Sequence, residues 1–431
     1  MSSESTCSSI DLSNSETSST INTTLTESSG SERQNLDLRG DILENYNIIS
    51  ELGNGAYSRV WLGYDISDGK YYAIKVQNAD DYEDAKDEIK ILKKIGNNSK
   101  YINRIHRNFT ESRFVEGEIN KYACSVFELC AGNLDGLSRK GKYKNGYPPK
   151  LVKQIFKQIC LGIKCLHNDI KVFHGDIKPD NILICGINNK DKKYMNDYSS
   201  ADFKDIYKKV KTQYWIQKGK NVKNIKKMDQ ETRQKIRRKI HTSIISNLGK
   251  NDESRYHIDN KYLEDLNIKV TDFGHFCPDD EMMEDDFGTK YYQAPEIVLM
   301  GNCTKKVDIW ALGCTLYELL TGNILFDLKK DNELSEDYIH LKEIINICGN
   351  FNREFLRTTK FHNEFFDKNG NLYDYKYNNT NSTEQILKEK LVYDNVTEDV
   401  DKISHLLAAM LTMPANRRLS IDKILEHPWL A

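Results

Sequence analysis

The hydrophobic pattern of this chain changes its period near residue 80. Between residues 46 and 77, three runs alternate apolar and polar side chains and are separated by short turn sequences: YNIISELGNG, SRVWLGYDI and KYYAIKVQ. Alternation of this kind is typical of antiparallel strands joined by tight turns. The next segment, YEDAKDEIKILKKI, instead places Ala85, Ile89 and Leu92 at helical spacing. The chain is therefore predicted to fold as an α+β protein in which a small antiparallel sheet comes first.

Helical patterns dominate the rest of the chain. One of them, PKLVKQIFKQICLGIKCLH at residues 149–167, has enough apolar side chains for a long buried helix. At 431 residues the chain also exceeds one typical hydrophobic core. We therefore expect a bilobal enzyme with additional disordered segments.

Two segments contain few large apolar side chains. Residues 1–44 consist mainly of Ser, Thr, Asn and Glu and are predicted to form a disordered tail, because so few apolar groups cannot offset the entropy of the chain. A second stretch at about residues 187–264 is rich in Lys, Asn, Asp and Tyr and is predicted to be a low-complexity insert. Its part QETRQKIRRKIHTSIISNL can form a helix, but the pattern indicates no second core.

The insert is basic, whereas the rest of the chain is acidic. Residues 188–264 contain 20 Lys and Arg against 10 Asp and Glu, a local charge of +10. Since the whole chain carries −2, the remainder carries −12. Within the insert, residues 218–239 have ten basic side chains and two acidic ones. This segment is therefore a candidate pseudosubstrate or nuclear import signal.

Cysteine usage and hydropathy indicate the compartment. The ten cysteines form no Cys-x-x-Cys pair and have no His cluster beside them, so we expect reduced thiols and no structural zinc. The N-terminal sequence has no basic region followed by an apolar run, and no eighteen consecutive residues are apolar. We expect a soluble intracellular protein without membrane contact, in the cytoplasm and, if the import signal operates, in the nucleus.

A glycine-rich turn between two predicted strands is the first candidate binding element. The backbone amides of such a turn can approach phosphate groups, although most glycine-rich hairpins are only turns. The candidate nucleotide-binding residues here are Gly53, Asn54, Gly55, Ala56, Tyr57, Ser58 and Val60. On a following strand, Lys75 can bridge two phosphates if a carboxylate orients its ammonium, and Glu88 on the next helix is the candidate carboxylate. Singly, either side chain could equally be a solvated surface residue.

Two further motifs supply acidic and amide side chains. FHGDIKPDN contains Asp176, a candidate base for a substrate hydroxyl, and Lys178, a candidate phosphate cation. Its last residue, Asn181, and Asp272 in TDFG carry the oxygen donors that Mg²⁺ prefers. APE follows at residues 294–296. Chance does not explain so many motifs in this order along one chain.

In this order of motifs, residues 46–430 resemble the eukaryotic protein kinase family, serine/threonine type. The resemblance implies a β-rich N-lobe at residues 45–130, a helical C-lobe at residues 131–431, and ATP with Mg²⁺ between them. It implies that Phe127 is the gatekeeper residue and that the hinge runs from Glu128 to Cys130. The resemblance also implies an adenine site lined by Val60, Ala73 and Leu183, and an active-state spine of Leu92, His174 and Phe273.

Within this family the chain is most similar to the SR-protein kinases. They share the serine after the second glycine of the loop, a long spacer after the catalytic-loop strand, and a C-lobe stretch like KFHNEFFDKNGNL. They also lack the arginine that precedes the catalytic aspartate in many kinases and grips a phosphate on the activation segment. Here Gly175 takes that place, and residues 275–288 contain no Ser, Thr or Tyr. We expect a constitutively active kinase in which the missing side chain of Gly175 has no cost.

The expected substrate is a basic, Arg/Ser-rich protein. Six carboxylates at Asp279, Asp280, Glu281, Glu284, Asp285 and Asp286 would border the substrate cleft, although such runs are often only solvated. We expect a monomer with no direct nucleic-acid partner. Two alternatives remain open: a pseudokinase or scaffold that binds without phosphotransfer, and a kinase of small molecules, which APE and the C-lobe extension disfavour.

Overall fold

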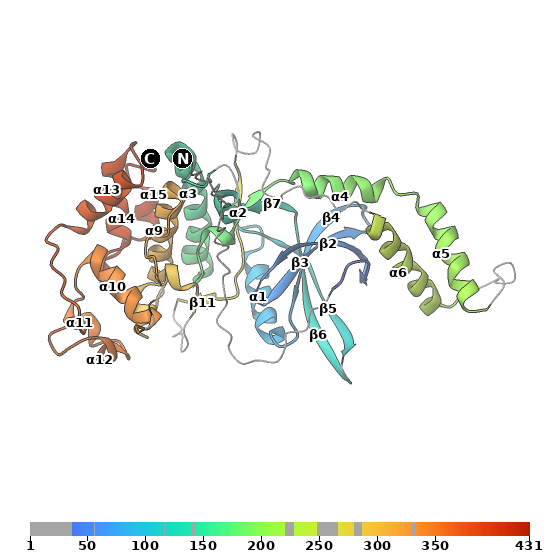
Figure 1. Cartoon of the computed structure of the whole chain (residues 1–431), viewed down its shortest axis with the longest axis horizontal. Helices are drawn as coiled ribbons and strands as arrows, with labels where there is room; N and C mark the ends of the chain where they lie inside the picture. Colours follow the sequence, from blue (N-terminus) through green and yellow to red (C-terminus); the bar gives the residue numbers. More distant parts are fainter. Residues whose placement is uncertain are drawn as a thin grey trace, which may run out of the picture. The chain divides into compact units, whose positions relative to one another are not determined.

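The computed structural model describes residues 37–55, 57–115, 117–139, 143–219, 228–247, 266–279, 287–329, 331 and 333–431. Residues 39–431 form one compact unit (Figure 1). Of the tail predicted over residues 1–44, residues 1–36 lie outside the described residues. The folded part starts before the predicted boundary, because β1 (Ile42–Leu43) already pairs with β2 (Tyr46–Asn54).

The N-lobe is built on an antiparallel sheet, as predicted. Its strand order within the described residues is β1-β2-β3-β4-β6-β5. The remaining strands are β3 (Ser58–Asp65), β4 (Tyr71–Gln77), β5 (Ile105–Val115) and β6 (Glu118–Phe127). Helix α1 (Tyr82–Ile95) contacts β5 and β6 and buries the predicted apolar face. The strands predicted between residues 46 and 77 and the helix after them are confirmed.

The register of β3 against β4 sets the position of the glycine-rich turn. Val60 lies opposite Lys75, and Leu62 lies opposite Ala73. Because side chains alternate along a strand, Ala73, Lys75 and Gln77 point to one face of β4, and Ile74 and Val76 to the other. The turn between β2 and β3 therefore lies over the lysine.

Two small sheets carry the motifs of the catalytic segments. One has the strand order β10-β9-β7, with β7 (Cys130–Asn133), β9 (Ile182–Cys185) and β10 (Ile268–Val270). The other pairs β8 (Val172–Phe173) with β11 (Cys277–Pro278). Asp176 and Asn181 lie between β8 and β9, and Asp272 follows β10. The pairing of these strands brings motifs that are almost 100 residues apart to the same place.

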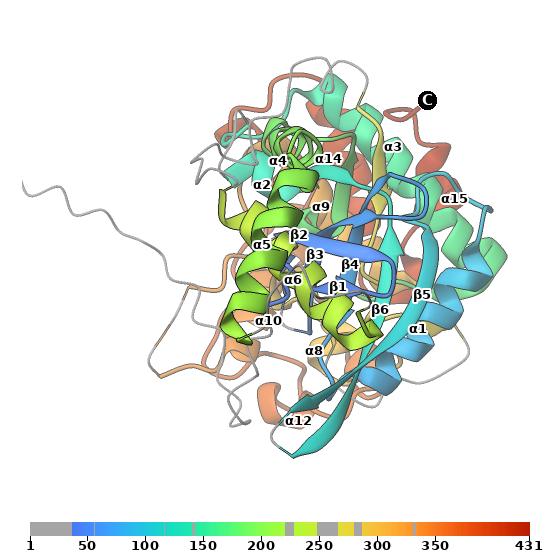
Figure 2. The same cartoon turned by 90° about the vertical axis from the view of Figure 1, so that its right-hand side faces the viewer.

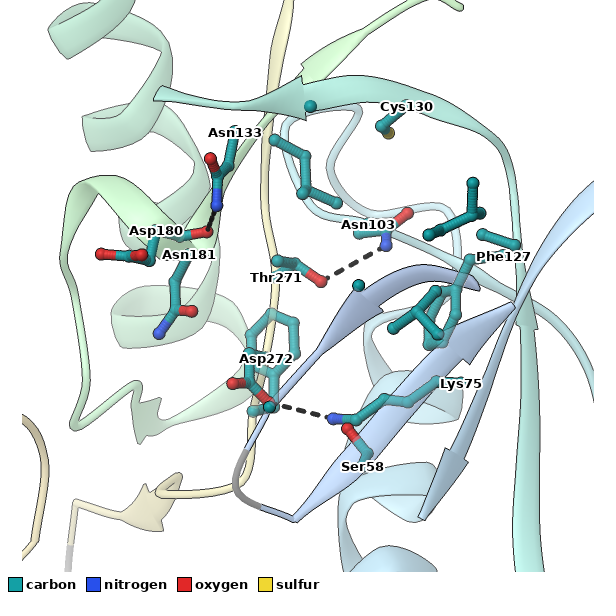
Figure 3. A pocket seen from close by; sticks show the side chains of 18 of the residues that line it. Ser58, Lys75, Asn103, Phe127, Cys130, Asn133, Asp180, Asn181, Thr271 and Asp272 are labelled. Carbon is teal, nitrogen blue, oxygen red and sulfur yellow. Dashed lines mark hydrogen bonds and ion pairs between the residues drawn. The ribbon is translucent and has the colours of Figure 1, made fainter. Parts of the chain in front are cut away.

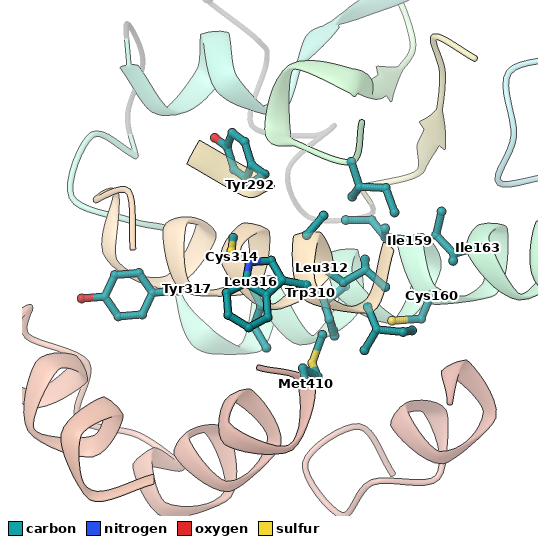
Figure 4. Close-up of a cluster of buried hydrophobic side chains, with 14 of the residues drawn as sticks. Ile159, Cys160, Ile163, Tyr292, Trp310, Leu312, Cys314, Leu316, Tyr317 and Met410 are labelled. Atoms are coloured by element: carbon teal, nitrogen blue, oxygen red, sulfur yellow. The ribbon is translucent and has the colours of Figure 1, made fainter. Parts of the chain in front are cut away.

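The C-lobe is helical, as predicted, and its core surrounds two buried helices. Helix α3 (Pro149–Lys164) is continued by a π-helical turn at Cys165–Ile170 and packs on α9 (Lys306–Thr321), which is buried along its whole length. Figure 4 shows the apolar side chains of α3 and α9 meeting beside Met410 of α14 (Val400–Met410). The other C-lobe helices are α2 (Leu134–Arg139), α8 (Pro295–Val298), α10 (Glu336–Cys348), α11 (Arg353–Leu356), α12 (His362–Phe365), α13 (Thr383–Tyr393) and α15 (Ile421–Leu425).

The insert differs from its prediction. It contains α4 (Asn189–Ser199), α5 (Phe203–Gln217) and α6 (Gln230–Asn247), so the helix expected at its centre is confirmed and two more are present. The prediction that the insert forms no second core was wrong, because these helices share a buried cluster with the N-lobe sheet. Figures 1 and 2 show the helices beside that sheet. The cluster contains Ile49, Leu62, Tyr198, Val210, Tyr214, Trp215, Ile236, Ile240 and Ile244.

Hydrogen bonds fix the insert to the sheet. Asn47 Nδ2 donates to the hydroxyl of Tyr198 at 2.9 Å, and that hydroxyl lies 2.8 Å from His241 Nδ1. The hydroxyl of Tyr71 donates to the carbonyl oxygen of Met195 at 2.9 Å. The buried polar groups named here are therefore paired across the two segments.

Among the described residues, the structure has no helix of the length and apolarity that a membrane crossing requires.

Candidate active site

A cavity of about 460 Å³ is lined by residues of both lobes (Figure 3). Most of the residues predicted to bind nucleotide line it, together with the candidate lysine, glutamate and metal ligands. They are Gly53, Asn54, Gly55, Ser58, Val60, Ala73, Lys75, Glu88, Glu128, Cys130, Asn181, Leu183 and Asp272. Ala56 lies outside the described residues. Tyr57 is not part of the lining; its half-exposed ring instead packs edge-on against His275, with 6.3 Å between ring centroids.

Lys75 joins the two lobes through carboxylates. Its Nζ donates to Glu88 Oε1 at 2.9 Å, to Glu88 Oε2 at 3.0 Å and to Asp272 Oδ1 at 2.9 Å. Burial lowers the pKa of Lys75, but Glu88 and Asp272 outweigh burial, so the pKa is raised. Lys75 also lowers the pKa of Asp272 to about 2. Lys75 and Asp272 are therefore charged at neutral pH, with the ammonium facing the cavity.

The Asp176 carboxylate is held from two sides. Its Oδ1 accepts hydrogen bonds from the backbone N–H and the hydroxyl of Thr289, at 2.9 and 2.7 Å. Its Oδ2 accepts hydrogen bonds from Lys178 Nζ at 2.7 Å and from Asn181 Nδ2 at 3.0 Å. Burial raises the pKa of Asp176, but Lys178 and Thr289 outweigh it, and the pKa is lowered. Asp176 is therefore an ionised acceptor with a fixed orientation. It lies beside the cavity and is hydrogen-bonded to Asn181, which lines the cavity.

Asn181 and Asp272 leave oxygen atoms for a cation. Because Asn181 Nδ2 donates to Asp176 Oδ2 and, at 2.8 Å, to the carbonyl oxygen of Asp176, its Oδ1 is directed away from them. Asp272 uses Oδ1 for Lys75 and is half exposed on the cavity side, where Figure 3 shows it beside Asn181. Its backbone has φ of 66°, a strained conformation that is rare outside glycine and typical of functional positions. A carboxylate and an amide oxygen fit a hard cation such as Mg²⁺.

A buried aspartate on α9 positions the catalytic segment. Asp308 is fully buried, and its two oxygens accept the backbone N–H groups of His174 at 2.8 Å and of Gly175 at 3.0 Å. The ring of His174 lies 5.1 Å from that of Phe273 between centroids, and both residues are buried with Leu92. The three side chains expected to form a spine are therefore all in the core.

Gly175 has a steric reason to be glycine. Its φ is +81°, and a β-carbon at this position would lie 2.4 Å from the backbone oxygen of His275. The carbonyl oxygen of Gly175 in turn lies 2.5 Å from where a β-carbon of Gly288 would be. The expectation that the missing side chain merely has no cost was incomplete, because the backbone of His275 leaves no room for a side chain at position 175.

Three contacts around the cavity were not predicted. Gln77 Nε2 donates to Glu88 Oε2 at 3.0 Å, and Asn103 Nδ2 donates to Thr271 Oγ1 at 3.3 Å (Figure 3). The third is an ion pair between Lys269 and Glu128 of the hinge. Sequence alone provides no signal for these contacts, because each joins two segments whose relative position is known only from the fold.

Three carboxylates on the C-lobe side of the cavity interact with Arg139. Its Nε forms an ion pair with Asp135, and Asp180 and Glu318 attract it from further away. Burial raises the pKa of Glu318 to about 7, although the Tyr292 hydroxyl donates to it at 2.5 Å. Asp180 also lines the cavity. The guanidinium group of Arg139 is therefore paired with Asp135 and attracted by two further acidic side chains.

The acidic run predicted beside the cleft is only partly described. Asp280 and the other predicted carboxylates up to residue 286 lie outside the described residues. The remaining one, Asp279, accepts the backbone N–H of Lys305 at 3.0 Å and forms an ion pair with its Nζ at 2.8 Å. Asp279 therefore anchors the activation segment to the start of α9.

Comparisons with known proteins agree with this geometry. Residues 46–215 and 257–430 match the family model described as protein kinase domain. The chain is 30% identical to the serine/threonine-protein kinase SRPK of Physarum polycephalum, over 90% of this chain and 86% of the relative. It is 26% identical to the protein kinase dsk1 of Schizosaccharomyces pombe, over 89% and 80%, and 23% identical to human SRSF protein kinase 3, over 91% and 87%.

Proposed function

We propose roles for the site residues from the premise that this chain belongs to the protein kinase family and is a serine/threonine kinase of the SR-protein kinase group. Members of the family transfer phosphate from ATP to protein hydroxyls with the help of a divalent metal. The single observation that carries the proposal is one cavity lined by Lys75, Asn181 and Asp272, with the Asp176 carboxylate hydrogen-bonded to Asn181 beside it. A scaffold that binds without phosphotransfer would not need these three charged groups to be oriented together.

On the phosphate side, Lys75 contacts the α- and β-phosphates, and Glu88 keeps its ammonium in place. The turn at Gly53 and Gly55 covers the same phosphates, and the missing side chains of the two glycines let the backbone come close to them. The adenine ring lies between Val60, Ala73 and Leu183, next to the hinge.

Magnesium, when bound, neutralises charge on the transferred phosphate. Asn181 Oδ1 and the free oxygen of Asp272 would hold it. These oxygens fit the ion by type, and the hydrogen bond from Asn181 Nδ2 to Asp176 fixes the orientation of the amide that presents Oδ1.

On the substrate side, Asp176 orients the attacking hydroxyl and accepts its proton. Its lowered pKa keeps the carboxylate ionised at neutral pH, and Thr289 and Asn181 keep it in one orientation. Lys178 donates to Asp176 and to Thr289 Oγ1, at 2.6 Å, and stabilises the negative charge of the transferred phosphate.

The proposed substrate is a basic protein segment containing arginine and serine. Support comes from the acidic charge of the chain outside the insert and from the carboxylates Asp135, Asp180 and Glu318, which surround an arginine beside the catalytic lysine. Acidic sites concentrate cationic peptides and raise their association rates. The similarity to a kinase named for SRSF proteins points to the same substrate class.

The experiment is transfer of the γ-phosphate from ATP to an arginine-serine peptide and to a neutral serine peptide. We expect transfer to both, faster to the basic peptide, and loss of at least about a hundredfold in Asp176→Asn and Asp272→Asn. Both variants should keep the wild-type Tm, because each replaces a carboxylate by an amide of the same shape. Equal rates on the two peptides would remove the substrate proposal, and wild-type turnover in Asp272→Asn would contradict the assigned metal site.

A further inference from the structure

Gln77 is a buried polar residue that the roles above do not use. It is the last residue of β4, two positions after Lys75, and is 5% exposed. Residues two apart on a strand share a face, so Gln77 and Lys75 both reach Glu88. The Nε2 of Gln77 donates to Glu88 Oε2 at 3.0 Å, and the Nζ of Lys75 donates to the same oxygen at the same distance. One strand therefore provides two donors to one carboxylate.

The orientation of the Gln77 amide follows from chemistry. An ionised carboxylate only accepts hydrogen bonds, so the NH₂ group must face Glu88. The carbonyl oxygen Oε1 is then buried without a partner among the described residues. A buried unpaired carbonyl destabilises the fold, whereas Met or Leu of similar size would not. A residue that is unfavourable for stability but well aimed at a site residue is typical of a functional position.

The role of Gln77 follows from the competing contacts of Lys75. Under the proposed function, the ammonium of Lys75 serves Glu88, Asp272 and the phosphates of ATP. Besides Lys75 and Gln77, Glu88 has one further donor among the described residues, the backbone N–H of Phe273, and this contact is long at 3.4 Å. We propose that Gln77 is a positioning residue: it keeps Glu88, and with it α1, in the inward position while the ammonium of Lys75 is shared among Glu88, Asp272 and phosphate. This inference rests on the proposed function.

The primary test is Gln77→Met, which keeps the length of the side chain and removes the donor. A site that is competent for only part of the time binds its ligand more weakly in proportion. We expect the KM for ATP to rise roughly three- to tenfold with a smaller change in kcat, and a Tm equal to or above that of the wild type. Hydrogen exchange of the α1 amides should be faster than in the wild type. Unchanged KM and unchanged exchange would overturn the proposal.

The matched control is Ile74→Val. Ile74 is fully buried on the same strand, but its side chain points to the opposite face. This variant should lower the Tm while leaving the KM for ATP and α1 exchange unchanged. If it raised the KM as much as Gln77→Met does, the effect would belong to the stability of the strand, and the proposal would fail.

A second variant, Gln77→Glu, gives a readout that a structural role alone would not produce. Among the described residues, Gln77 contacts Glu88, Glu88 pairs with Lys75, and Lys75 in turn pairs with Asp272. A new carboxylate beside Glu88 repels it when ionised but donates to it when protonated. The activity of Gln77→Glu relative to wild type should therefore increase as the pH falls from 8 to 6. A ratio that does not vary with pH would contradict the proposed hydrogen bond.

Exchange measurements separate this inference from the proposed function. They are made with and without a non-hydrolysable ATP analogue and magnesium, so they need no turnover. If the wild type transfers no phosphate, the proposed function fails, and α1 exchange in Gln77→Met still decides the role of Gln77. If the wild type is active and the variant behaves like it in both assays, only the role of Gln77 fails.

Discussion

At position 175 the backbone leaves no room for a side chain. Two separate features exclude it. The positive φ of Gly175 is a local backbone conformation that favours glycine. The 2.4 Å separation between a β-carbon at this position and the His275 oxygen is a tertiary contact. A substitution therefore adds conformational strain and displaces the activation segment. Since the neighbouring residue is Asp176, the displacement would be felt at the carboxylate that Thr289 holds.

We predict that Gly175→Ala lowers kcat by at least about tenfold, because a shift of 1 Å at a reacting group typically has a larger effect than that. The measurement is peptide phosphorylation at saturating ATP. Gly117→Ala is the matched control: Gly117 also has positive φ, at +98°, but nothing lies within 4 Å of its β-carbon position. Both variants carry about 1–2 kcal/mol of backbone strain. Equal loss of activity in the two variants would mean that strain, not the contact with His275, is responsible.

Glu318 predicts a pH dependence of substrate choice. Its pKa is raised to about 7, so the carboxyl changes from mainly protonated to mainly ionised between pH 6 and 8. Only the ionised form attracts a guanidinium. The KM for an arginine-serine peptide should therefore fall as the pH rises over this range, relative to that for a neutral peptide, and Glu318→Gln should abolish the difference. If Glu318→Gln kept the full pH dependence, another group would be responsible.

At the scale of elements, the insert is part of the N-lobe. The sheet and α1 could be predicted because strand and helix periods are visible in the sequence. The insert core could not be predicted, because its apolar residues are sparse on each helix and become a cluster only against Ile49 and Leu62 of the sheet. Tertiary contact, not local pattern, decides whether such helices form.

This packing changes the expected result of removing the insert. If the insert were a pseudosubstrate, deleting residues 190–260 would lower the KM for basic peptides. From the structure we instead expect the deletion to expose the apolar face of the sheet, lower the Tm and promote aggregation. Two point variants isolate the contact. Tyr198 is buried, so Tyr198→Ala should lower the free energy of unfolding by about 3–5 kcal/mol. Tyr207 is partly exposed on α5, so Tyr207→Ala should lower it much less. Thermal unfolding measures both, and equal losses would contradict the docked arrangement.

At the scale of the whole molecule, hydrogen bonds between side chains and from a side chain to the backbone join the two lobes. Lys75 bridges Glu88 and Asp272, and Lys94 of α1 donates to the carbonyl oxygen of Ile170 in the C-lobe at 3.0 Å. The APE glutamate, Glu296, is held by the buried Arg418 through two hydrogen bonds of 2.5 and 2.7 Å.

We predict that the kinase is active without an activating kinase. Protein made in bacteria and treated with phosphatase should retain most of its activity on the arginine-serine peptide. The control is Lys75→Ala, which should be inactive before and after treatment, so that residual contaminating kinases are detected. Loss of wild-type activity after phosphatase, recovered by incubation with ATP, would show that phosphorylation is needed.

The residues that carry the chemistry of the site could be predicted from the sequence, but the residues that hold them in position could not. Asp176, Asn181 and Asp272 could be predicted as site residues because phosphoryl transfer requires these residue types in this order, and the structure brings them close together. Gln77 and Asn103 could not, because an amide has no fixed partner until the register of the strands and the position of α1 are known. Chemistry leaves a local pattern, whereas the contacts that hold it depend on the complete fold.

The docking of the insert on the sheet also affects how the protein is made. Ile49 and Leu62 leave the ribosome early, but their cover includes Ile244, which is synthesised 182 positions after Leu62. At ordinary elongation rates this delay is roughly 10–40 s, longer than most folding steps need. A nascent N-lobe with an uncovered apolar face is a binding site for chaperones during that interval. Slowing or speeding translation of the insert should therefore change the soluble yield of the kinase without changing its sequence.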